Sequence, residues 1–296
     1  ELKEIFKKEK ITHAYIQSHG FYLDYYQLMN REIWGKCQTT YHYVFGPMAR
    51  QGSDIRCVIG KDLNKRFFKK IPVLPYIVNR HIFQGNLRKE LNIKKNNLVI
   101  GRHGGFKTFD IKFVKEAIKE ILEIRKDIIF LFLNTEKFIE NERVIYLPKT
   151  TSVELKSKFI DTCDAMLHAR IDGETFGLAV AEFSAANKPI ITYAYSKDSE
   201  HLRILNKKAI TYKNKKSLIN IIFKLNKNQI INKDWNCYKI YEPNHVIKIF
   251  DELCLKKKSK KFNILEFIYD LPWELIIFIK YNIYKILKNI FKVFPF

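Results

Sequence analysis

Short apolar segments alternate along the chain with segments whose apolar residues recur at helical spacing. The segments 11–20 and 37–47 predict two buried strands that end in loops. Farther along, short apolar segments predict further strands at 96–101, 128–134, 144–148, 165–170 and about 190–193. Strands at such intervals, with helices between them, are typical of an α/β fold built on a parallel sheet.

The helical segments follow the strands at regular intervals. Apolar residues at the helical period predict helices at 109–126, 152–163 and 177–187. Asn187 is expected to be a left-handed cap before Pro189, and two closing helices are expected within 231–255 around Pro243. This repeated alternation of strand and helix predicts a doubly wound α/β domain.

The segment 71–86 predicts a connection between two domains. It contains Pro72, Pro75 and Gly85 and fits neither a helix nor a long strand. A chain of 296 residues also exceeds what one hydrophobic core usually supports. We therefore expect a first domain at 1–80, a second domain at 81–255, and a basic, aromatic tail at 256–296.

The composition indicates a folded and strongly basic protein. Hydrophobic residues make up 47% of the chain, which excludes a disordered polypeptide. The formal net charge of +22 attracts polyanions, whether nucleic acid, acidic lipid or a phosphorylated small molecule, although the lysine excess also fits an AT-rich genome. Because the lysines are scattered and no recognised nucleic-acid motif occurs, we expect no specific nucleic-acid partner.

The five cysteines are widely spaced and form neither a CxxC pair nor a Cys/His cluster with zinc spacing. This usage favours a reducing compartment. No signal peptide opens the chain, and no uncharged apolar segment of about eighteen residues predicts a transmembrane helix. A cytoplasmic location is therefore expected.

A glycine-rich turn between a predicted strand and a predicted helix is the first candidate site. Gly101, Gly104 and Gly105 would let backbone amides approach an anion closely, and Arg102 and Lys107 would add mobile positive charge. The alternative is a tight turn that needs positive φ angles.

Two glutamates eight residues apart form the second candidate site. Glu182 lies within an otherwise apolar predicted helix, where an ionised carboxylate is costly unless it is hydrogen-bonded. The vicinal diol of a ribose would supply such bonds, and the alternative is a structural Lys or Arg partner. The predicted helix start near Phe176 and Gly177 offers backbone amides and a positive dipole end to the phosphates of the same nucleotide.

Glu174, Phe176, Gly177 and Glu182, followed by a small-residue helix end and the segment 188–191, resemble the E-x7-E signature of retaining GT-B glycosyltransferases. The resemblance implies two Rossmann-like doubly wound domains that face a cleft, with an acceptor-side domain at 1–80 and a donor-binding domain at 81–255. It implies that Glu174 contacts the transferred sugar and Glu182 the ribose. The donor would be held by Gly101, Arg102, Gly104, Gly105, Lys107, Glu174, Thr175, Phe176, Gly177, Leu178 and Glu182.

In the acceptor domain of this family a histidine at a strand end borders the reacting carbon. The resemblance makes His19 the first choice for this catalytic position and His42 the second, although a lone histidine is more often structural. The glycine loop that follows the family's first strand is not found in this chain, which predicts an incomplete acceptor domain.

The resemblance implies transfer of a hexose or similar sugar from a nucleoside diphosphate sugar to a hydroxyl, with retention, in glycan or glycolipid synthesis. The acceptor would be a glycan, a lipid-linked molecule or a protein. No DxD pair occurs, and the cations of the glycine-rich turn can meet the charge of the leaving group, so no metal and no cofactor is expected. A binding protein or an epimerase on the same fold is the main alternative, and a basic nucleic-acid-binding protein is the second.

The segment 256–296 begins with KKKSKK and continues with apolar residues near helical spacing and interspersed lysines. It is expected to bind an anionic membrane surface reversibly, because basic residues are attracted to acidic headgroups. The alternative is a helix that packs against the acceptor domain.

Overall fold

The computed structural model describes residues 2–18, 34–45, 53–66 and 71–256. The chain divides into two compact units. The first comprises Glu1–Pro75 together with Val246–Phe296, and the second comprises Tyr76–His245.

The first unit contains a three-stranded parallel sheet. Its strands are β1 (His13–Ser18), β2 (Gln38–Tyr43) and β3 (Ile55–Val58), in that order. The predicted strands at 11–20 and 37–47 and their parallel arrangement are therefore confirmed. The remaining described elements of this unit are α1 (Leu2–Lys8), the 3-10 helix η1 (Lys61–Arg66), and most of α9 (Pro243–Phe250) with the π-helical turn η4 (Asp251–Leu255).

The end of the described chain returns to the first unit. The Phe250 ring packs edge-on against the Tyr15 ring of β1 at a centroid distance of 5.4 Å, and Gln38 Nε2 donates to the Cys254 carbonyl oxygen at 3.2 Å. The sequence placed the domain limits at 80 and 255, whereas the structure divides the chain after Pro75 and before Val246. This packing joins residues more than 200 positions apart, so no local sequence pattern predicts it.

The second unit is built on a six-stranded parallel sheet with the order β11-β9-β7-β4-β5-β6. Its strands are β4 (Leu98–His103), β5 (Ile128–Leu133), β6 (Val144–Leu147), β7 (Ala165–His168), β9 (Ile190–Tyr193) and β11 (Ile210–Tyr212). Taken in chain order, these strands follow the 3-2-1-4-5-6 arrangement of dinucleotide-binding folds. All five predicted strands of this unit are confirmed, and the doubly wound sheet with them.

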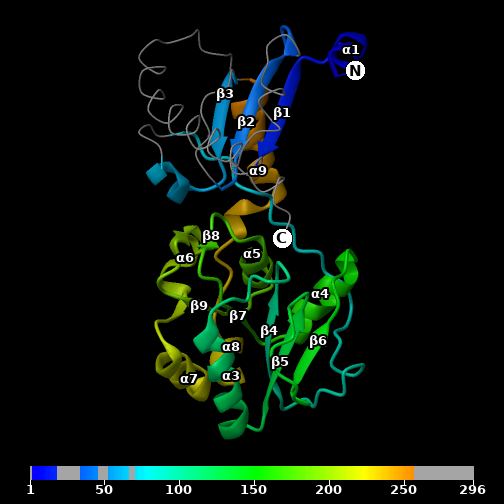
Figure 1. The fold of residues 1–296 in the computed structure, drawn as a ribbon. Coiled ribbons are helices and arrows are strands. Elements are labelled where there is room, and N and C mark those ends of the chain that lie inside the picture. Colours follow the sequence, from blue (N-terminus) through cyan, green and yellow to red (C-terminus); the bar gives the residue numbers. More distant parts are fainter. Residues whose placement is uncertain (1, 19–33, 46–52, 67–70, 257–296) are drawn as a thin grey trace, which may run out of the picture. The chain divides into compact units, whose positions relative to one another are not determined.

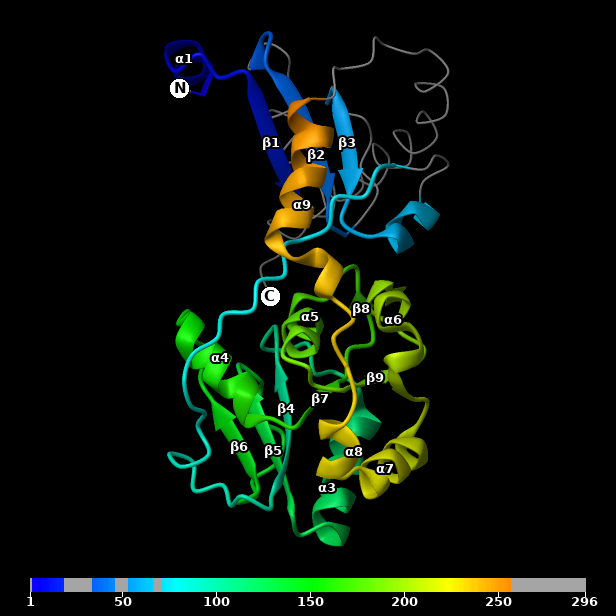
Figure 2. The ribbon, with the colours of Figure 1, turned by 180° about the vertical axis from the view of Figure 1, so that it is seen from behind.

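Helices cover both faces of this sheet (Figure 1, and from behind in Figure 2). On one face, α3 (Lys112–Ile124) and α7 (Lys215–Lys224) bury Ile118 and Ile222 in a core with Phe130 of β5. On the other face lie α4 (Val153–Thr162) and α5 (Leu178–Ala185), since a side chain at Gly101 of β4 would meet Cys163 and Phe183. The smaller elements are β8 (Gly173–Glu174), β10 (Asp198–Ser199), α6 (Glu200–Leu205), η2 (Asn206–Lys208), α8 (Lys227–Ile231) and η3 (Lys239–Tyr241).

The predicted helices at 109–126, 152–163 and 177–187 are confirmed, and Asn187 has the expected positive φ of 57°. Of the two closing helices, only the second forms as α9. The first is wrong, because α8 ends at Ile231 and the segment after it bonds to the end of α5. Trp235 N donates to Asn187 Oδ1 at 2.7 Å, and Ser184 Oγ donates to the Trp235 carbonyl oxygen at 2.9 Å.

Helices long and apolar enough to cross a membrane are absent from the ranges that the structure describes.

Candidate functional site

The predicted site residues of the second unit lie at the carboxyl ends of β4 and β7, two neighbouring strands at the centre of the sheet. The chain leaves β4 toward β5 on one side, and it leaves β7 toward β9 on the other. This divergence is the switch point of a doubly wound sheet, where ligands bind in folds of this kind. The topology therefore brings the glycine-rich turn and Glu174 to the same edge of the sheet. In the sequence, only the resemblance to the E-x7-E signature assigned Glu174 to the same donor site as this turn.

Arg102 ends its strand as a buried brace of the turn. Its side chain donates to the Asn134 carbonyl oxygen at 3.2 Å, to Thr135 Oγ1 at 2.6 Å, to the Gly105 carbonyl oxygen at 2.8 Å and to Thr108 Oγ1 at 2.6 Å. Only 4% of the residue is exposed. The expectation that Arg102 supplies mobile positive charge is therefore wrong, because these four bonds fix the guanidinium within the protein.

Arg102 remains charged although its side chain is buried. Desolvation lowers the pKa of the guanidinium to about 10, although the charges of Glu174 and Asp110 act in the opposite direction. Arg102 thus remains protonated at neutral pH and contributes a fixed positive charge beneath the turn.

The three glycines of the turn have different roles. Gly101 lies within β4, and a Cβ there would stand 2.2 Å from Cys163 Sγ, so this glycine serves the packing of strand against helix. Gly104 has a φ of 153°, which side-chain-bearing residues rarely adopt, as the tight-turn alternative requires. A Cβ at Gly105 would stand 2.9 Å from Thr108 Cγ2. Lys107, by contrast, is exposed at the tip of the turn and makes no ion pair with any residue that the structure describes.

Glu174 is held through both of its carboxylate oxygens. His168 Nε2 lies 3.2 Å from Oε1, and Arg170 Nη1 donates to Oε2 at 3.2 Å. Burial raises the pKa of Glu174, but the hydrogen bond from His168 and the positive charge of Arg170 outweigh it, so the pKa lies below its usual value. The carboxylate is therefore ionised and oriented at neutral pH.

The helix α5 begins shortly after Glu174 and Thr175. Its cap is Gly177, whose φ of 83° favours glycine and where a Cβ would stand only 3.2 Å from Glu174 Cβ. Phe176 is buried against Tyr238, and Leu178 remains 44% exposed. Backbone amides in the first turn of a helix have no intrahelical partner, so this end of α5 is suited to an anion.

Glu182 has two cationic or hydrogen-bonding neighbours. Lys156 Nζ of α4 donates to Oε1, and His103 Nε2 at the end of β4 lies 3.0 Å from Oε2, outside good hydrogen-bond geometry. Burial raises the pKa of Glu182, but His103 and Lys156 together bring it below its usual value. The structure therefore agrees with the alternative in which Glu182 is paired with a structural lysine.

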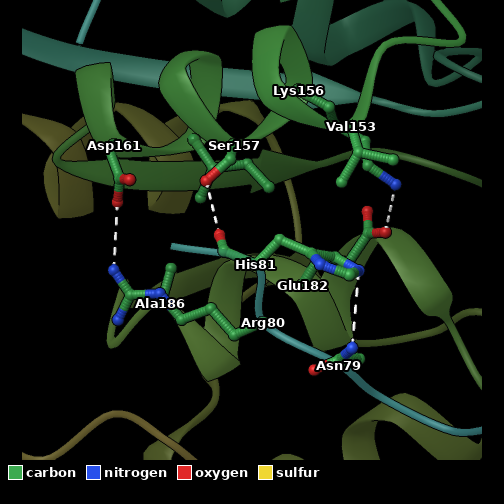
Figure 3. Close-up of a pocket in the computed structure, with 10 residues that line it drawn as sticks. Asn79, Arg80, His81, Val153, Lys156, Ser157, Asp161, Glu182 and Ala186 are labelled. Carbon is green, nitrogen blue, oxygen red and sulfur yellow. Dashed lines mark hydrogen bonds and ion pairs between the residues drawn. The ribbon is translucent and has the colours of Figure 1, made fainter. Parts of the chain in front are cut away.

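A small pocket opens beside this ion pair. Figure 3 shows the connecting segment 79–81 lying between α4 and α5, with Arg80 paired to Asp161 and the His81 carbonyl oxygen accepting from Ser157 Oγ at 2.7 Å. Lys156 and Glu182 line the same pocket. Its volume of about 40 Å³ accommodates a few water molecules rather than a nucleotide, and Lys156 occupies one oxygen of the Glu182 carboxylate.

The two histidines predicted for the acceptor side belong to the first unit. His19 lies outside the described residues. His42 is 1% exposed within β2, where Tyr15 Oη lies 2.5 Å from Nδ1, and burial lowers the pKa of His42 to about 4. His42 is therefore a neutral core histidine, as the structural alternative describes.

Sequence reasoning missed four residues that organise the site: His103, Lys156, His168 and Arg170. Arg170 ends the predicted strand at 165–170 and stands four positions before Glu174, and His168 lies within that strand, so both had a local signal. Lys156 had none, because only the packing of α4 beside α5 brings it to Glu182. Among the described residues, no three or more His, Cys, Asp or Glu side chains gather in a way that would hold a metal ion.

No protein-family model and no curated protein matches the sequence. Among solved structures, a glycosyltransferase from Rickettsia africae ESF-5 is similar, with a TM-score of 0.64 and 13% identity over 86% of this chain and 80% of that chain. TarM aligns with a TM-score of 0.61 and 10% identity over 85% of this chain and 57% of its own. HepE of Anabaena, solved in complex with UDP-glucose, aligns with a TM-score of 0.59 and 13% identity over 75% and 72%. At these identities the similarity establishes the fold, which is the α/β GT-B type with Rossmann-like parallel sheets.

Proposed function

We propose that the protein transfers a sugar from a nucleoside diphosphate sugar to a hydroxyl of an acceptor. The observation that carries the proposal is the placement of two ionised carboxylates beside the switch point of the sheet, Glu174 just before α5 and Glu182 within it. Carboxylates are suitable partners for the hydroxyls of a sugar and of a ribose. The similar fold of glycosyltransferases, one of them bound to UDP-glucose, supports this use of the site.

Each carboxylate has its own proposed partner. Glu174, at the edge between β7 and α5, contacts the transferred sugar. Glu182, in the pocket wall, accepts hydrogen bonds from the ribose hydroxyls, and Lys156 then moves aside or bonds the same ligand. The spacing of the two glutamates, which resembles the E-x7-E signature, supports transfer with retention of the anomeric configuration.

The diphosphate has two sources of positive charge in this proposal. Lys107 is exposed at the tip of the turn and can reach an anion, while the first turn of α5 offers backbone amides. Arg102 acts indirectly, because its four hydrogen bonds hold the turn in shape and its charge adds to the local potential. Together they would stabilise the charge that develops on the leaving nucleoside diphosphate.

A screen of nucleotide sugars tests the proposal. UDP-glucose is the first donor to be tried, beside the GDP-, ADP- and dTDP-linked sugars, with the shift of the unfolding temperature as the measure of binding. We expect at least one nucleotide sugar to stabilise the protein and to be converted to a glycosylated product, by mass spectrometry, when glycan, lipid-linked or protein acceptors are added.

The outcomes separate the alternatives. Stabilisation by a nucleotide sugar without transfer to any acceptor would favour a binding protein. Conversion of the bound sugar into an isomer would favour an epimerase, and the absence of stabilisation by every donor would contradict nucleotide-sugar binding at this site.

A further inference from the structure

A continuous line of hydrogen bonds runs from Glu174 into the core of the second unit. His168 Nε2 lies 3.2 Å from Glu174 Oε1, and His168 Nδ1 lies 2.9 Å from Thr192 Oγ1. Thr192 Oγ1 lies in turn 3.1 Å from His201 Nε2. The line joins β8, β7, β9 and α6, all of them in the second unit (Figure 1).

The inner members of this line are shielded from water. His168 is 5% exposed, while Thr192 and His201 are completely buried. His168 and Thr192 are register partners on adjacent strands, and the two imidazole rings lie 4.8 Å apart between centroids. Their positions are therefore set by the sheet and by the docking of α6, and buried polar groups placed in this way must satisfy one another.

The chemistry of the four groups permits one order of protons when both imidazoles are neutral. An ionised carboxylate only accepts, so His168 carries its proton on Nε2 and accepts on Nδ1. Thr192 must then donate its single hydroxyl proton to His168. Toward His201 the same hydroxyl can only accept, so His201 also carries its proton on Nε2.

We propose that His168, Thr192 and His201 form a proton-ordered relay that holds Glu174 ionised and in one orientation for the transferred sugar. This inference rests on the proposed function, and it makes His168 a positioning residue. His168 fixes Oε1 while Arg170 fixes Oε2, so the plane of the carboxylate is determined from both sides. Thr192 and His201 prevent the His168 ring from turning, because rotation would leave Nδ1 without its buried donor.

The tautomers are measured directly by ¹⁵N NMR of the imidazoles in the full chain, without any ligand. We expect the Nε2–H form for both His168 and His201. A Nδ1–H form of either ring at neutral pH would overturn the relay. This measurement does not depend on glycosyl transfer, so it decides the relay even if the proposed function fails.

Glu174→Gln provides a second test of the proton order. Arg170 can only donate, so the new amide oxygen should face Arg170 and the new amide nitrogen should face His168. His168 Nε2 must then accept, which reverses every donor in the line. We expect both histidines to change to the Nδ1–H form, and unchanged tautomers would contradict the coupling from Glu174 to His201.

Substitutions at Thr192 test the role in turnover, with the nucleotide sugar that gives the largest thermal shift among the donors screened. Thr192→Val removes the hydroxyl at nearly constant volume, and we expect turnover to fall about 10-fold or more with nucleotide affinity unchanged, because a misplaced group costs rate rather than binding. Thr192→Ser keeps the hydroxyl and should retain most of the activity.

Thr162→Val is the matched control. Thr162 is also completely buried, and its hydroxyl accepts a hydrogen bond from Leu87 N and donates one to the Lys158 carbonyl oxygen, but it lies outside the relay. We expect wild-type turnover in Thr162→Val. Turnover of Thr192→Val equal to that of the wild type would overturn the positioning role. If the wild-type chain turns over no nucleotide sugar, the proposed function is contradicted. In that case the NMR measurement of the histidine tautomers alone decides whether the relay exists.

Discussion

At the residue scale, the two cations of the glycine-rich turn differ in where their charge is used. Arg102 donates to Asn134, Thr135, Gly105 and Thr108 inside the protein, whereas Lys107 is exposed. Substituting the first should therefore affect folding, and substituting the second should affect an anionic ligand.

Arg102→Lys is expected to destabilise the protein by about 2–4 kcal/mol, because an ammonium group cannot reproduce the planar fork and leaves buried acceptors without donors. Lys107→Ala should leave the unfolding temperature unchanged and weaken binding of a nucleoside diphosphate more than binding of the free nucleoside. Thermal unfolding and calorimetric titration measure the two effects. Equal stability of the two variants would show that the guanidinium does not brace the turn.

Glu182→Gln is expected to weaken nucleotide binding and to change the response of stability to acid. Since the pKa of Glu182 is lowered in the folded protein, its charge stabilises the fold above the unfolded pKa of about 4.3 and this contribution is lost as the pH falls through the folded pKa. The variant should therefore lose less stability than the wild type when the pH falls from about 5 to 3. Parallel unfolding temperatures across this range, or unchanged nucleotide affinity, would contradict the assignment.

The residue scale also limits what a sequence can predict. Glu182 was singled out as a carboxylate that needs partners, since its apolar neighbours are adjacent in the chain, and in the structure it is half-buried and paired. Its partners Lys156 and His103 come from α4 and β4, so their identity depends on packing. Arg102 was expected to be mobile because its acceptors come together only in the folded protein, two from the turn itself and two from Asn134 and Thr135 after β5.

At the scale of elements, Gly101 allows β4 and the end of α4 to approach closely. A Cβ at this position would stand 2.2 Å from Cys163 Sγ and 3.1 Å from Phe183 Cζ, and both of these residues are buried. The strand and the two helices that carry the candidate site are thus spaced by the absence of one side chain.

Gly101→Ala is expected to destabilise the protein by about 1–3 kcal/mol through overpacking. The cost should be smaller in a Cys163→Ala background, where the sulfur is removed, and should persist in a Cys163→Ser background, which keeps a γ atom. Denaturant unfolding of the single and double variants gives the coupling energy. Additive effects of Gly101→Ala and Cys163→Ala would contradict the contact.

Most elements could be predicted from periodicity, but the shortest could not. β11 has three residues, too few to establish an alternation, whereas β3 was missed although its four residues equal the length of the predicted strands β6, β7 and β9. α7 was missed although Asn214 and Ser217 form a capping box and its apolar residues Leu218 and Ile222 lie at helical spacing, so its signal was present. The first of the two closing helices expected within 231–255 does not form, because Trp235 N and Cys237 N donate to side chains at the end of α5 instead of to helical carbonyl oxygens.

At the scale of the whole molecule, the alternation of strand and helix was sufficient to predict the doubly wound parallel sheet of the second unit. The division of the chain into two units was harder to predict from the sequence, because the return of 246–255 to the first unit depends on contacts with Tyr15 and Gln38. Residues 257–296 lie outside the described ranges, so attachment of this segment to a membrane stays a prediction from its sequence.

The basic segment KKKSKK at 256–261 should attract the full chain to vesicles that contain anionic lipid, at roughly 1 kcal/mol per basic residue near the surface. Replacement of its five lysines by glutamine should abolish co-sedimentation, and added salt should weaken it. Neutral vesicles are the control. Binding that resists both salt and the replacement would contradict electrostatic attachment, and wild-type protein that stays in the supernatant would contradict membrane binding.

The central claim is that Glu174 serves the transfer of a sugar from a nucleoside diphosphate. NMR of a reaction that contains the stabilising nucleotide sugar, ¹³C-labelled in its sugar, tests this claim most directly when wild type and Glu174→Ala are compared. We expect the labelled anomeric signal to move from the diphosphate to an acceptor oxygen with its configuration retained, and the rate to fall by at least about 100-fold in Glu174→Ala with nucleotide affinity nearly unchanged. Equal rates for the two proteins, or a labelled sugar that stays on its nucleotide with every acceptor, would contradict the account.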